Sequence, residues 1–570
     1  MLQGQPVIIL REGTERDTGK SARHNNIAAA VAVAEAVRST LGPSGMDKML
    51  VDSLGEVVIT NDGATIMKEL EVEHPAAKML VEVAKTQDNE VGDGTTTAVV
   101  LAGELLKRSE ELVDKNVHPT VIAAGYKMAQ EHGMVLLNKM AIELDRKDSR
   151  SLKSIAETAV TGKNVGGNPS IIADLAVKAV MAVTEESNGV VKADTENIKV
   201  EKKHGAAVSD SQLIQGIVID KERVHSRMPE YVDGAKIALI SQALEIKKTE
   251  VSSSIQIREP SQIQKFLDQE EKSLHEMADM IINAGANVVI CEKGISESVQ
   301  YYLSKQGIYA VQRAKKSDME KLARATGGRL VANLRDITSK DLGHSARVEQ
   351  RKVSDEDMTF ITGCKNPRSV TVLLRAGTEH VVEELERAFN DAIRVVSAAT
   401  EDGKMLPGGG AVEIALSLKL RDYASTVGGR EQLAVEAFAS ALESIPRTLA
   451  ENAGLDPIDT ILELKTRHSA KNSSNTEGIS VDGGKIKDMV RAKVLEPLRV
   501  KKQALASATE VAVMILRIDD VIAAKRGSES AAPPGGAGGM PPGMGGMGGM
   551  GGMGGMGGMG GMGGMPPGMM

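Results

Sequence analysis

Apolar residues recur every three or four positions along both ends of the chain, a spacing typical of helices that bury one face. This pattern predicts mostly helical structure over residues 24–145 and again over residues 383–525. Between residues 217 and 365, short runs rich in valine and isoleucine alternate with helical stretches. We expect strands at 235–241 and 286–291 with a helix between them, and this alternation predicts a βαβ layer with a largely parallel sheet. The simplest arrangement pairs the two helical ends around an inserted centre.

Three stretches depart from this pattern. Residues 49–66 carry alternating β-branched side chains followed by Asn61-Asp62-Gly63, which predicts a hairpin with its turn at the Asn-Asp-Gly sequence. Residues 249–260 are polar apart from a few aliphatic side chains and are expected to form an exposed excursion. Residues 527–570 are mainly Gly-Gly-Met repeats, which cannot bury a core, so a disordered tail is expected there.

The composition narrows the class of protein. The 570 residues carry 69 Lys and Arg against 77 Asp and Glu, and this net charge of −8 argues against a nucleic-acid coat. Aromatic residues make up 2% and tryptophan is absent, which argues against binding of single strands by base stacking. The two cysteines, Cys291 and Cys364, are far apart, which excludes a disulfide scaffold and CxxC zinc sites. The chain begins without a signal-peptide pattern, and no apolar run approaches the roughly 18 residues of a spanning helix, so a soluble cytoplasmic protein is expected.

The segment from Gly13 to Ser21 resembles a phosphate-binding loop but has the wrong spacing. Such a loop needs four residues between its glycines so that backbone N–H groups curl around phosphate. Here five residues separate Gly13 from Gly19, and no strand-then-helix unit is expected around them. A polar N-terminal arm is the favoured interpretation.

The sequence GDGTTT at residues 92–97 directly precedes a predicted helix. Glycines let the backbone approach an anion, a helix start offers free N–H groups, and the three hydroxyls add donors. Asp93 would repel a bare phosphate, so the arrangement makes sense with a divalent cation between them. A simple helix cap with a tight turn explains the same residues equally well.

Four other short sequences could contribute to one site. Residues 41–48 form a rigid turn after a helix, and residues 61–65 are more often a hairpin turn. Asp391 lies inside a predicted helix, where a carboxylate is usually solvated, and the Gly triplet at 408–410 could admit a flat ring or a sugar. Lys163 follows Thr-Gly in a loop, where a solvated charge is the ordinary interpretation. Together these residue types fit magnesium-assisted phosphoryl transfer, which needs mainly positioning and charge neutralisation.

Taken in order, these motifs resemble those of the chaperonin family, over residues 1–526 or so and most closely its archaeal group II members, kin to the eukaryotic cytosolic chaperonin. The stretches that carry the resemblance are residues 40–106, 219–239, 401–413 and 496–525. The resemblance implies a multidomain fold with an all-α equatorial domain, an α/β intermediate domain and an α/β apical domain with a helical protrusion. The implied boundaries are 1–147 with 402–526, 148–216 with 368–401, and 217–367, with the protrusion at about 245–275.

The resemblance also implies roles for single residues. Asp93 would bind Mg²⁺, and Asp391 would position or deprotonate the attacking water with Asp62 assisting. Lys163 would sense the γ-phosphate of ATP. The residues expected to contact the nucleotide are Gly42, Pro43, Asn61, Gly94, Thr95, Thr96, Thr97, Gly409 and Glu496, the last two at the ribose and base. Because Asp391 and the phosphate cradle belong to different implied domains, hydrolysis would require these domains to close.

The implied function is ATP-dependent protein folding with ATP and Mg²⁺ as cofactors. The resemblance implies a double ring of like or mixed subunits that encloses non-native client proteins. Residues 249–260 and the following helix would act as a built-in lid, so that no separate lid co-chaperonin is required. Neither nucleic acid nor membrane is an expected partner. Two alternatives stay open: a small phosphotransferase that uses Gly13 to Ser21, and a ring scaffold that binds nucleotide without folding clients.

Overall fold

The computed structural model describes residues 14–163, 168–246, 260–364, 369–470, 475–480 and 484–524. The described residues divide into two units, one made of residues 14–16 with 522–524 and the other lying within residues 17–521. Strands β1 (Thr14–Thr18) and β21 (Asp520–Ala524) pair as a two-stranded sheet. The predicted excursion, apart from Pro260, and the predicted tail lie outside the described residues.

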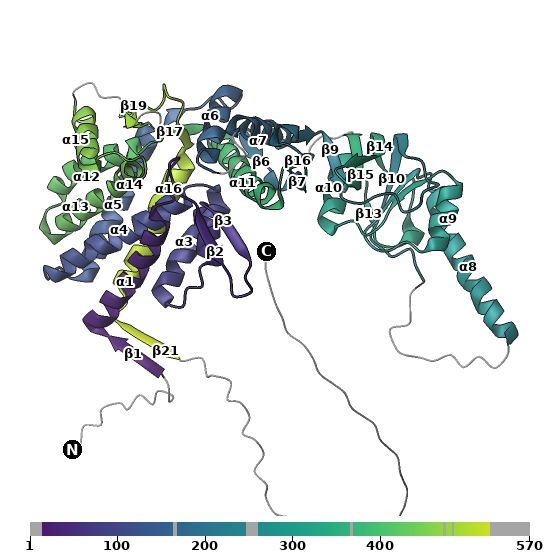
Figure 1. Cartoon of the computed structure of the whole chain (residues 1–570), viewed down its shortest axis with the longest axis horizontal. Helices are drawn as coiled ribbons and strands as arrows, with labels where there is room; N and C mark the ends of the chain where they lie inside the picture. Colours follow the sequence, from purple (N-terminus) through teal and green to yellow (C-terminus); the bar gives the residue numbers. More distant parts are fainter. Residues whose placement is uncertain are drawn as a thin grey trace, which may run out of the picture. The chain divides into compact units, whose positions relative to one another are not determined.

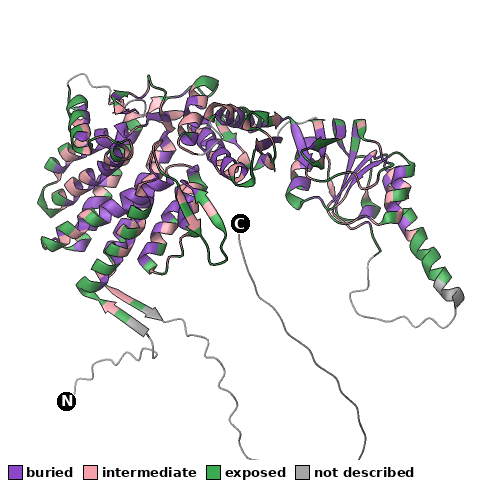
Figure 2. Cartoon of the chain, viewed as in Figure 1, coloured by how far each residue is buried: buried purple, intermediate pink, exposed green. Residues whose placement is uncertain are grey.

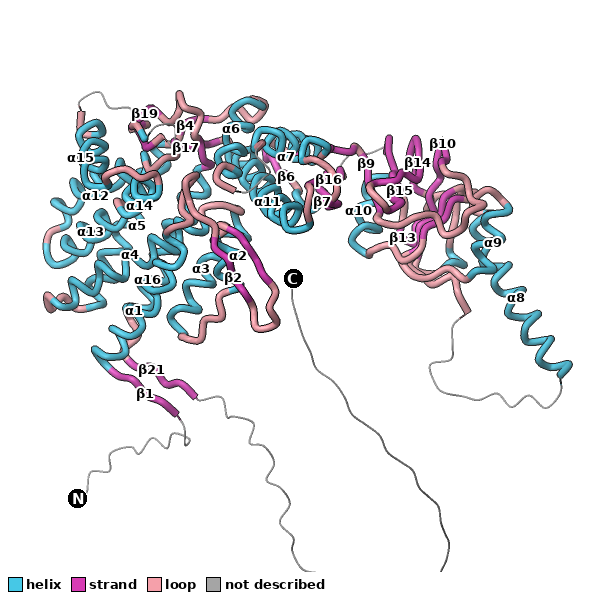
Figure 3. The backbone as a smooth tube through the Cα atoms, in the orientation of Figure 1, coloured by secondary structure: helices cyan, strands magenta, loops and turns pink. Residues whose placement is uncertain are grey.

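A helical core joins the first and last parts of the larger unit, as Figures 1 and 3 show. Its apolar cluster draws on residues 27–137 and 406–516. The few aromatic side chains contribute to it: Tyr126 is fully buried, packs edge-on against Phe438 at 5.6 Å and donates a hydrogen bond to the carbonyl of Leu105 at 2.8 Å. The helices of this core are α1 (Gly19–Arg38), α2 (Gly63–Glu69), α3 (Pro75–Val91), α4 (Thr95–Asp114), α5 (Pro119–Met140), α12 (Ala411–Val427), α13 (Gly429–Leu442), α14 (Ser444–Asn452), α15 (Pro457–His468) and α16 (Leu498–Leu516).

Short strands line the edges of this helical part. Strands β2 (Lys48–Val51) and β3 (Val57–Thr60) form a hairpin, and β18 (Glu477–Ile479) pairs with β19 (Ile486–Asp488). Strand β17 (Lys404–Pro407) lies between β20 (Leu495–Pro497) and β4 (Ile142–Glu143), and both neighbours run antiparallel to it. The β17–β20 register pairs Pro407 with Leu495, so the Gly triplet that follows β17 is fixed beside the start of β20.

A second apolar core is built from segments on both sides of the chain's centre. Its long helix α11 packs against α6 and α7, and parallel pairing of β7 with β16 covers another side. The elements of this part are α6 (Ser149–Val160), α7 (Pro169–Val183), β5 (Thr184–Ser187), β6 (Val190–Ala193), β7 (Ile198–His204), β8 (Gln212–Ile214), β16 (Val370–Ala376) and α11 (Glu379–Asp402).

The central part is α/β, but its sheet is mixed rather than largely parallel as predicted. Strands β11 and β12 run parallel to β10, and β13 also pairs with β10 in parallel, whereas β10, β14, β15 and β9 pair antiparallel. The prediction missed the long hairpin of β14 and β15 because their alternating polar and apolar residues lack the continuous valine and isoleucine runs of a doubly covered strand. The elements are β9 (Gly216–Ile219), β10 (Tyr231–Ile240), α8 (Pro260–Asn283), β11 (Val288–Cys291), α9 (Glu297–Lys305), β12 (Tyr309–Val311), α10 (Lys316–Thr326), β13 (Leu330–Val331), β14 (Gly343–Val353) and β15 (Glu356–Cys364).

In helix α8, residues 264–272 are exposed and the buried positions begin at Leu274. Leu274, Ala278 and Ile281 are at most 8% exposed, whereas Phe266 and Leu267 are about half exposed. Figure 2 shows the same change along the described part of the helix, from buried near its C-terminal end to exposed in the middle. The buried face of this helix therefore meets the core of the central part over the last three turns.

Two further expectations need correction. The turn of the β2–β3 hairpin is at Asp52 to Glu56, and Asn61-Asp62-Gly63 instead begins α2, with Asp62 as the N-cap. An Asx residue caps a helix start as readily as it makes a turn, which is why the sequence could not separate the two. In addition, a strand and a helix do meet between Thr14 and Arg38, but β1 runs directly into α1 without a phosphate-binding loop between them.

Among the described residues, no helix is long and apolar enough to cross a bilayer.

Candidate nucleotide-binding site

The GDGTTT sequence forms a tight junction between two helices. Gly92 ends α3 with φ +71°, and Gly94 caps the start of α4 with φ +75°. Both angles lie in the left-handed region, which glycine adopts without steric cost. Asp93 lies between them, and its Oδ1 accepts a hydrogen bond from the Gly94 N–H at 2.6 Å. The first turn of α4 therefore presents free N–H groups and the positive end of its dipole, as an anion site requires.

Gln87 of α3 holds the loop at residues 92–94 in place by hydrogen bonds. The sequence did not single out this residue. Its side chain is fully buried, and its amide donates to the carbonyl of Asp93 at 2.8 Å and to the carbonyl of Val500 at 3.2 Å. This one amide links the acidic residue of the loop to the first turn of α16. A single glutamine in an amphipathic helix gives no sequence signal for such a role.

The start of α2 lies against the same helix start. The N-cap carboxylate of Asp62 accepts from the N–H of Thr65 at 2.9 Å and from its hydroxyl at 2.8 Å. Gly63 is required by close packing, because a Cβ there would lie 2.5 Å from Oγ1 of Thr96. Burial alone would raise the pKa of Asp62, but Lys163 and the hydrogen bonds from Thr65 hold it below its usual value.

Residues 42–43 meet the loop that carries Lys163. A Cβ on Gly162 would lie 2.9 Å from Cα of Pro43, and the amide of Asn61 donates to the Gly162 carbonyl. Gly42 has φ +82°, and a Cβ there would overlap Leu449 at 2.3 Å. These contacts direct the loop lysine inward, so it is not the solvated charge of the ordinary interpretation.

Lys163 forms an ion pair with Asp391 of α11. The two side chains are 13% and 9% exposed. Burial raises the pKa of Asp391 to about 8, and Asp62 adds to this effect while Lys163 opposes it. Burial alone would lower the pKa of Lys163, but its three acidic neighbours, Asp391, Asp62 and Asp93, together raise it. The four groups therefore form one electrostatic cluster.

A second buried cluster lies around Glu496. Its Oε2 is 2.8 Å from Nζ of Lys501, and the same ammonium is 2.8 Å from Oε1 of Glu413. Burial raises the pKa of Glu496, Glu413 adds to this, and Lys501 opposes it. Gly409 lies close by with φ +63°, where a Cβ would be 2.9 Å from the carbonyl of Ile479.

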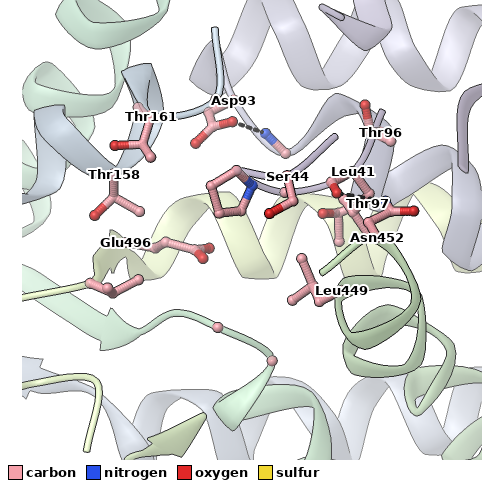
Figure 4. Close-up of a pocket in the computed structure, with 18 of the residues that line it drawn as sticks. Leu41, Ser44, Asp93, Thr96, Thr97, Thr158, Thr161, Leu449, Asn452 and Glu496 are labelled. Atoms are coloured by element: carbon pink, nitrogen blue, oxygen red, sulfur yellow. Dashed lines mark hydrogen bonds between the residues drawn. The ribbon is translucent and has the colours of Figure 1, made fainter. Parts of the chain in front are cut away.

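A single cavity of about 440 Å³ connects these elements. In Figure 4, Asp93 and Glu496 lie around the same open space, with Leu449 and Asn452 on the helix beside it. Every sequence-predicted site residue except Asp391 lines this cavity: Gly42, Pro43, Asn61, Asp62, Asp93, Gly94, Thr95, Thr96, Thr97, Lys163, Gly409 and Glu496. Asp391 reaches the cavity through its ion pair with Lys163. The sequence did not predict Thr158, Leu449, Asn452 or Lys501 as lining residues.

The end of the cavity that contains Asp93 and the start of α4 could hold a divalent cation that a bound ligand also coordinates. Asp62, Asp93 and Asp391, when ionised, leave an excess of two negative charges over Lys163. Burial raises the pKa of Asp93, while Lys163 and the Gly94 N–H oppose this, so a cation beside Asp93 would relieve an electrostatic penalty. In the described part of the chain, no group of three or more His, Cys, Asp or Glu side chains is arranged to hold a metal alone. One carboxylate plus ligand phosphates is the coordination that Mg²⁺ often takes.

Comparisons with known proteins show the family to which the chain belongs. The model of the family described as "TCP-1/cpn60 chaperonin family" matches residues 33–526. The beta thermosome subunit of Archaeoglobus fulgidus is 61% identical over 540 residues, which is 95% of this chain and 98% of the relative. The alpha thermosome subunit of Thermoplasma acidophilum is 57% identical over 545 residues, again 95% and 98%. The structure of an open-state group II chaperonin monomer from Methanococcoides burtonii matches with a TM-score of 0.58 and 47% identity, covering 75% of this chain and all of that one. The chain therefore belongs to the TCP-1/cpn60 chaperonin family and is an ATP-hydrolysing group II chaperonin with a built-in lid.

Proposed function

We propose that the cavity binds ATP with its ribose and base at Gly409 and Glu496 and its phosphates at residues 94–97. The observation that carries this proposal is the polarity of the 440 Å³ cavity. One end has a helix start and a lysine with three carboxylates, and the other has a glycine loop and a single lysine-held carboxylate. A charged, cation-dependent triphosphate suits the first end, and a sugar with a flat base suits the second.

At the phosphate end, Asp93 would hold Mg²⁺, which neutralises phosphate charge when bound. Asp391 positions the attacking water and takes its proton as the oxygen bonds to the γ-phosphorus and the bond to ADP breaks. Asp62 assists in orienting this water. Lys163 leaves Asp391 for the γ-phosphate, which frees the carboxylate for its role as a base.

The fold suggests how hydrolysis couples to movement. We assign an all-α equatorial domain to 1–147 and 402–526, an α/β intermediate domain to 148–216 and 368–401, and an α/β apical domain to 217–367. Separate apolar clusters in the helical part, around α11 and on the central sheet support three bodies. Because Asp391 belongs to the second body and residues 94–97 to the first, hydrolysis completes when these bodies close on each other.

The assembly follows from the relatives, whose names as alpha and beta subunits fit a ring of like or mixed subunits. We infer two stacked rings that enclose non-native proteins. Residues at about 245–275, which include the start of α8, act as the lid, so that no separate lid co-chaperonin is required. The cytoplasmic location stays a prediction.

The test is ATP-dependent refolding by the assembled full-length protein. A denatured client enzyme should regain activity with Mg-ATP but not without nucleotide, and the protein should elute as a particle of many subunits. A large particle that hydrolyses ATP without any refolding of several clients would favour the scaffold alternative and overturn the proposed folding cycle.

A further inference from the structure

A buried lysine lies where a cation is disfavoured. Lys501 is in the first turn of α16, close to the positive end of the helix dipole. Its side chain is 10% exposed, so water cannot compensate its charge. Two carboxylates compensate it instead, and they raise its pKa although burial alone would lower it. A residue that opposes both the dipole and burial points to a specific task at this position.

The two carboxylates come from elements that are fixed independently. Glu413 lies in the first turn of α12 and is 6% exposed. Glu496 lies in the middle of β20, opposite Leu406 of β17. Lys501 therefore ties the strand that carries Glu496 to the helix that follows the Gly triplet.

The ion pair with Lys501 fixes one carboxylate oxygen of Glu496 and leaves the other oxygen available for a ligand. Oε2 is held by Lys501 at 2.8 Å, whereas Oε1 lies near Gly408, where a Cβ would come within 2.9 Å of it. Any side chain at Gly408 would displace that oxygen. The adjacent ammonium opposes the rise in the pKa of Glu496 that burial causes, and an oxygen of an ionised carboxylate accepts hydrogen bonds but does not donate them.

We propose that Lys501 is a positioning residue for the sugar of the nucleotide: by holding Oε2 of Glu496 it aims Oε1 at the ribose hydroxyls, and so it sets the selectivity for ribose over sugars that lack them. The proposal rests on the placement of the ribose at Glu496 in the proposed function. A sugar without hydroxyls leaves a desolvated carboxylate oxygen unpaired, which is penalised more strongly than a missing apolar contact.

The experiment compares ATP with 2′,3′-dideoxy-ATP in steady-state hydrolysis by the assembled full-length protein. The wild type should show a KM at least about tenfold lower for ATP, the effect of a hydrogen bond to a charged acceptor. Lys501→Met should bring the two KM values within about twofold of each other, chiefly by raising the KM for ATP. Lys501→Arg should restore part of the difference, because a guanidinium can also bridge two carboxylates. Lys502→Met removes the same charge from the next residue and should keep the wild-type ratio.

A second variant guards against misfolding, because Lys501→Met leaves two buried carboxylates without a cation. The double variant Glu413→Gln with Lys501→Met removes one charge of each sign and keeps Glu496, and it should lose selectivity in the same way. If either variant assembles and retains the wild-type ratio, the inference about Lys501 is wrong while the proposed site stands. If the wild type hydrolyses both nucleotides with equal KM, the ribose does not lie at Glu496, and the proposed placement fails with the inference.

Discussion

Replacing Asp391 with asparagine should stop ATP hydrolysis and leave nucleotide binding largely intact. The amide has nearly the same size as the carboxylate but cannot accept the proton of the attacking water. A positioned general base contributes about 10²–10⁴-fold in rate. At 1.36 kcal/mol per factor of ten this is about 3–5 kcal/mol of activation free energy. The side chain is 9% exposed, so bulk water cannot take over its role.

The same substitution should cost little stability. Breaking a buried ion pair typically costs about 3–5 kcal/mol because the remaining charge is left uncompensated. Here Asp62 and Asp93 still face Lys163 after the change, and one carboxylate fewer reduces their mutual repulsion. We therefore expect a loss well below that range, so that assembly persists and the catalytic effect can be measured.

The assay is phosphate release at saturating Mg-ATP, together with equilibrium binding of a fluorescent ATP analogue. Glu383→Gln is the matched control, because it replaces a half-exposed carboxylate on the same helix whose ion pair with Lys202 lies at the surface. An assembled Asp391→Asn protein that hydrolyses ATP within about tenfold of the wild-type rate would refute the role of this carboxylate, since a general base contributes at least about 10²-fold.

Three further outcomes are expected. Because a base acts when deprotonated and burial raises the pKa of Asp391 to about 8 in the free protein, kcat/KM for Mg-ATP should climb from pH 6 to pH 9; a flat profile, as for a carboxylate with the ordinary pKa near 3.9, would contradict this. Asp93→Asn should raise the Mg²⁺ concentration for half-maximal hydrolysis by about tenfold or more, measured by titrating Mg²⁺ into chelator-treated protein, and an unchanged midpoint would exclude Asp93 as the ligand. Gly63→Ala should weaken ATP binding by at least about tenfold, because the new Cβ would lie 2.5 Å from the Thr96 hydroxyl, whereas Gly377→Ala, with no atom within 4 Å, should bind normally.

Local patterns in the sequence predicted the helices well, since apolar spacing is decided by which face each helix buries. Helices α3 and α5 both begin at a proline, as the first-turn preference of that residue indicates. The same local view failed at Asn61-Asp62-Gly63, where capping and turning use the same side-chain chemistry. It also failed for the β14–β15 hairpin, because the direction of strand pairing depends on partners far away in the chain.

The candidate site was predictable in part. The residues that match family motifs, apart from Asp391, line one cavity, yet the spacing of those motifs gave no distances between them. Gln87 and Lys501 were missed because their contacts are mainly with distant segments of the chain. Gln87 contacts Val500, and Lys501 contacts Glu413, in each case more than 80 residues away. A lysine in the first turn of a helix was the one available signal, since the helix dipole disfavours it there.

The cavity can form only after most of the chain has been synthesised. Its walls come from residues 40–63, 93–97, 157–163 and 409–501, so a nascent chain lacks one wall until translation has passed the start of α16. The central sheet needs nothing beyond Cys364 for its strands and can form long before then. Ribosome-bound chains should therefore acquire the central sheet early and the capacity to bind ATP last, which keeps unfinished subunits from consuming nucleotide.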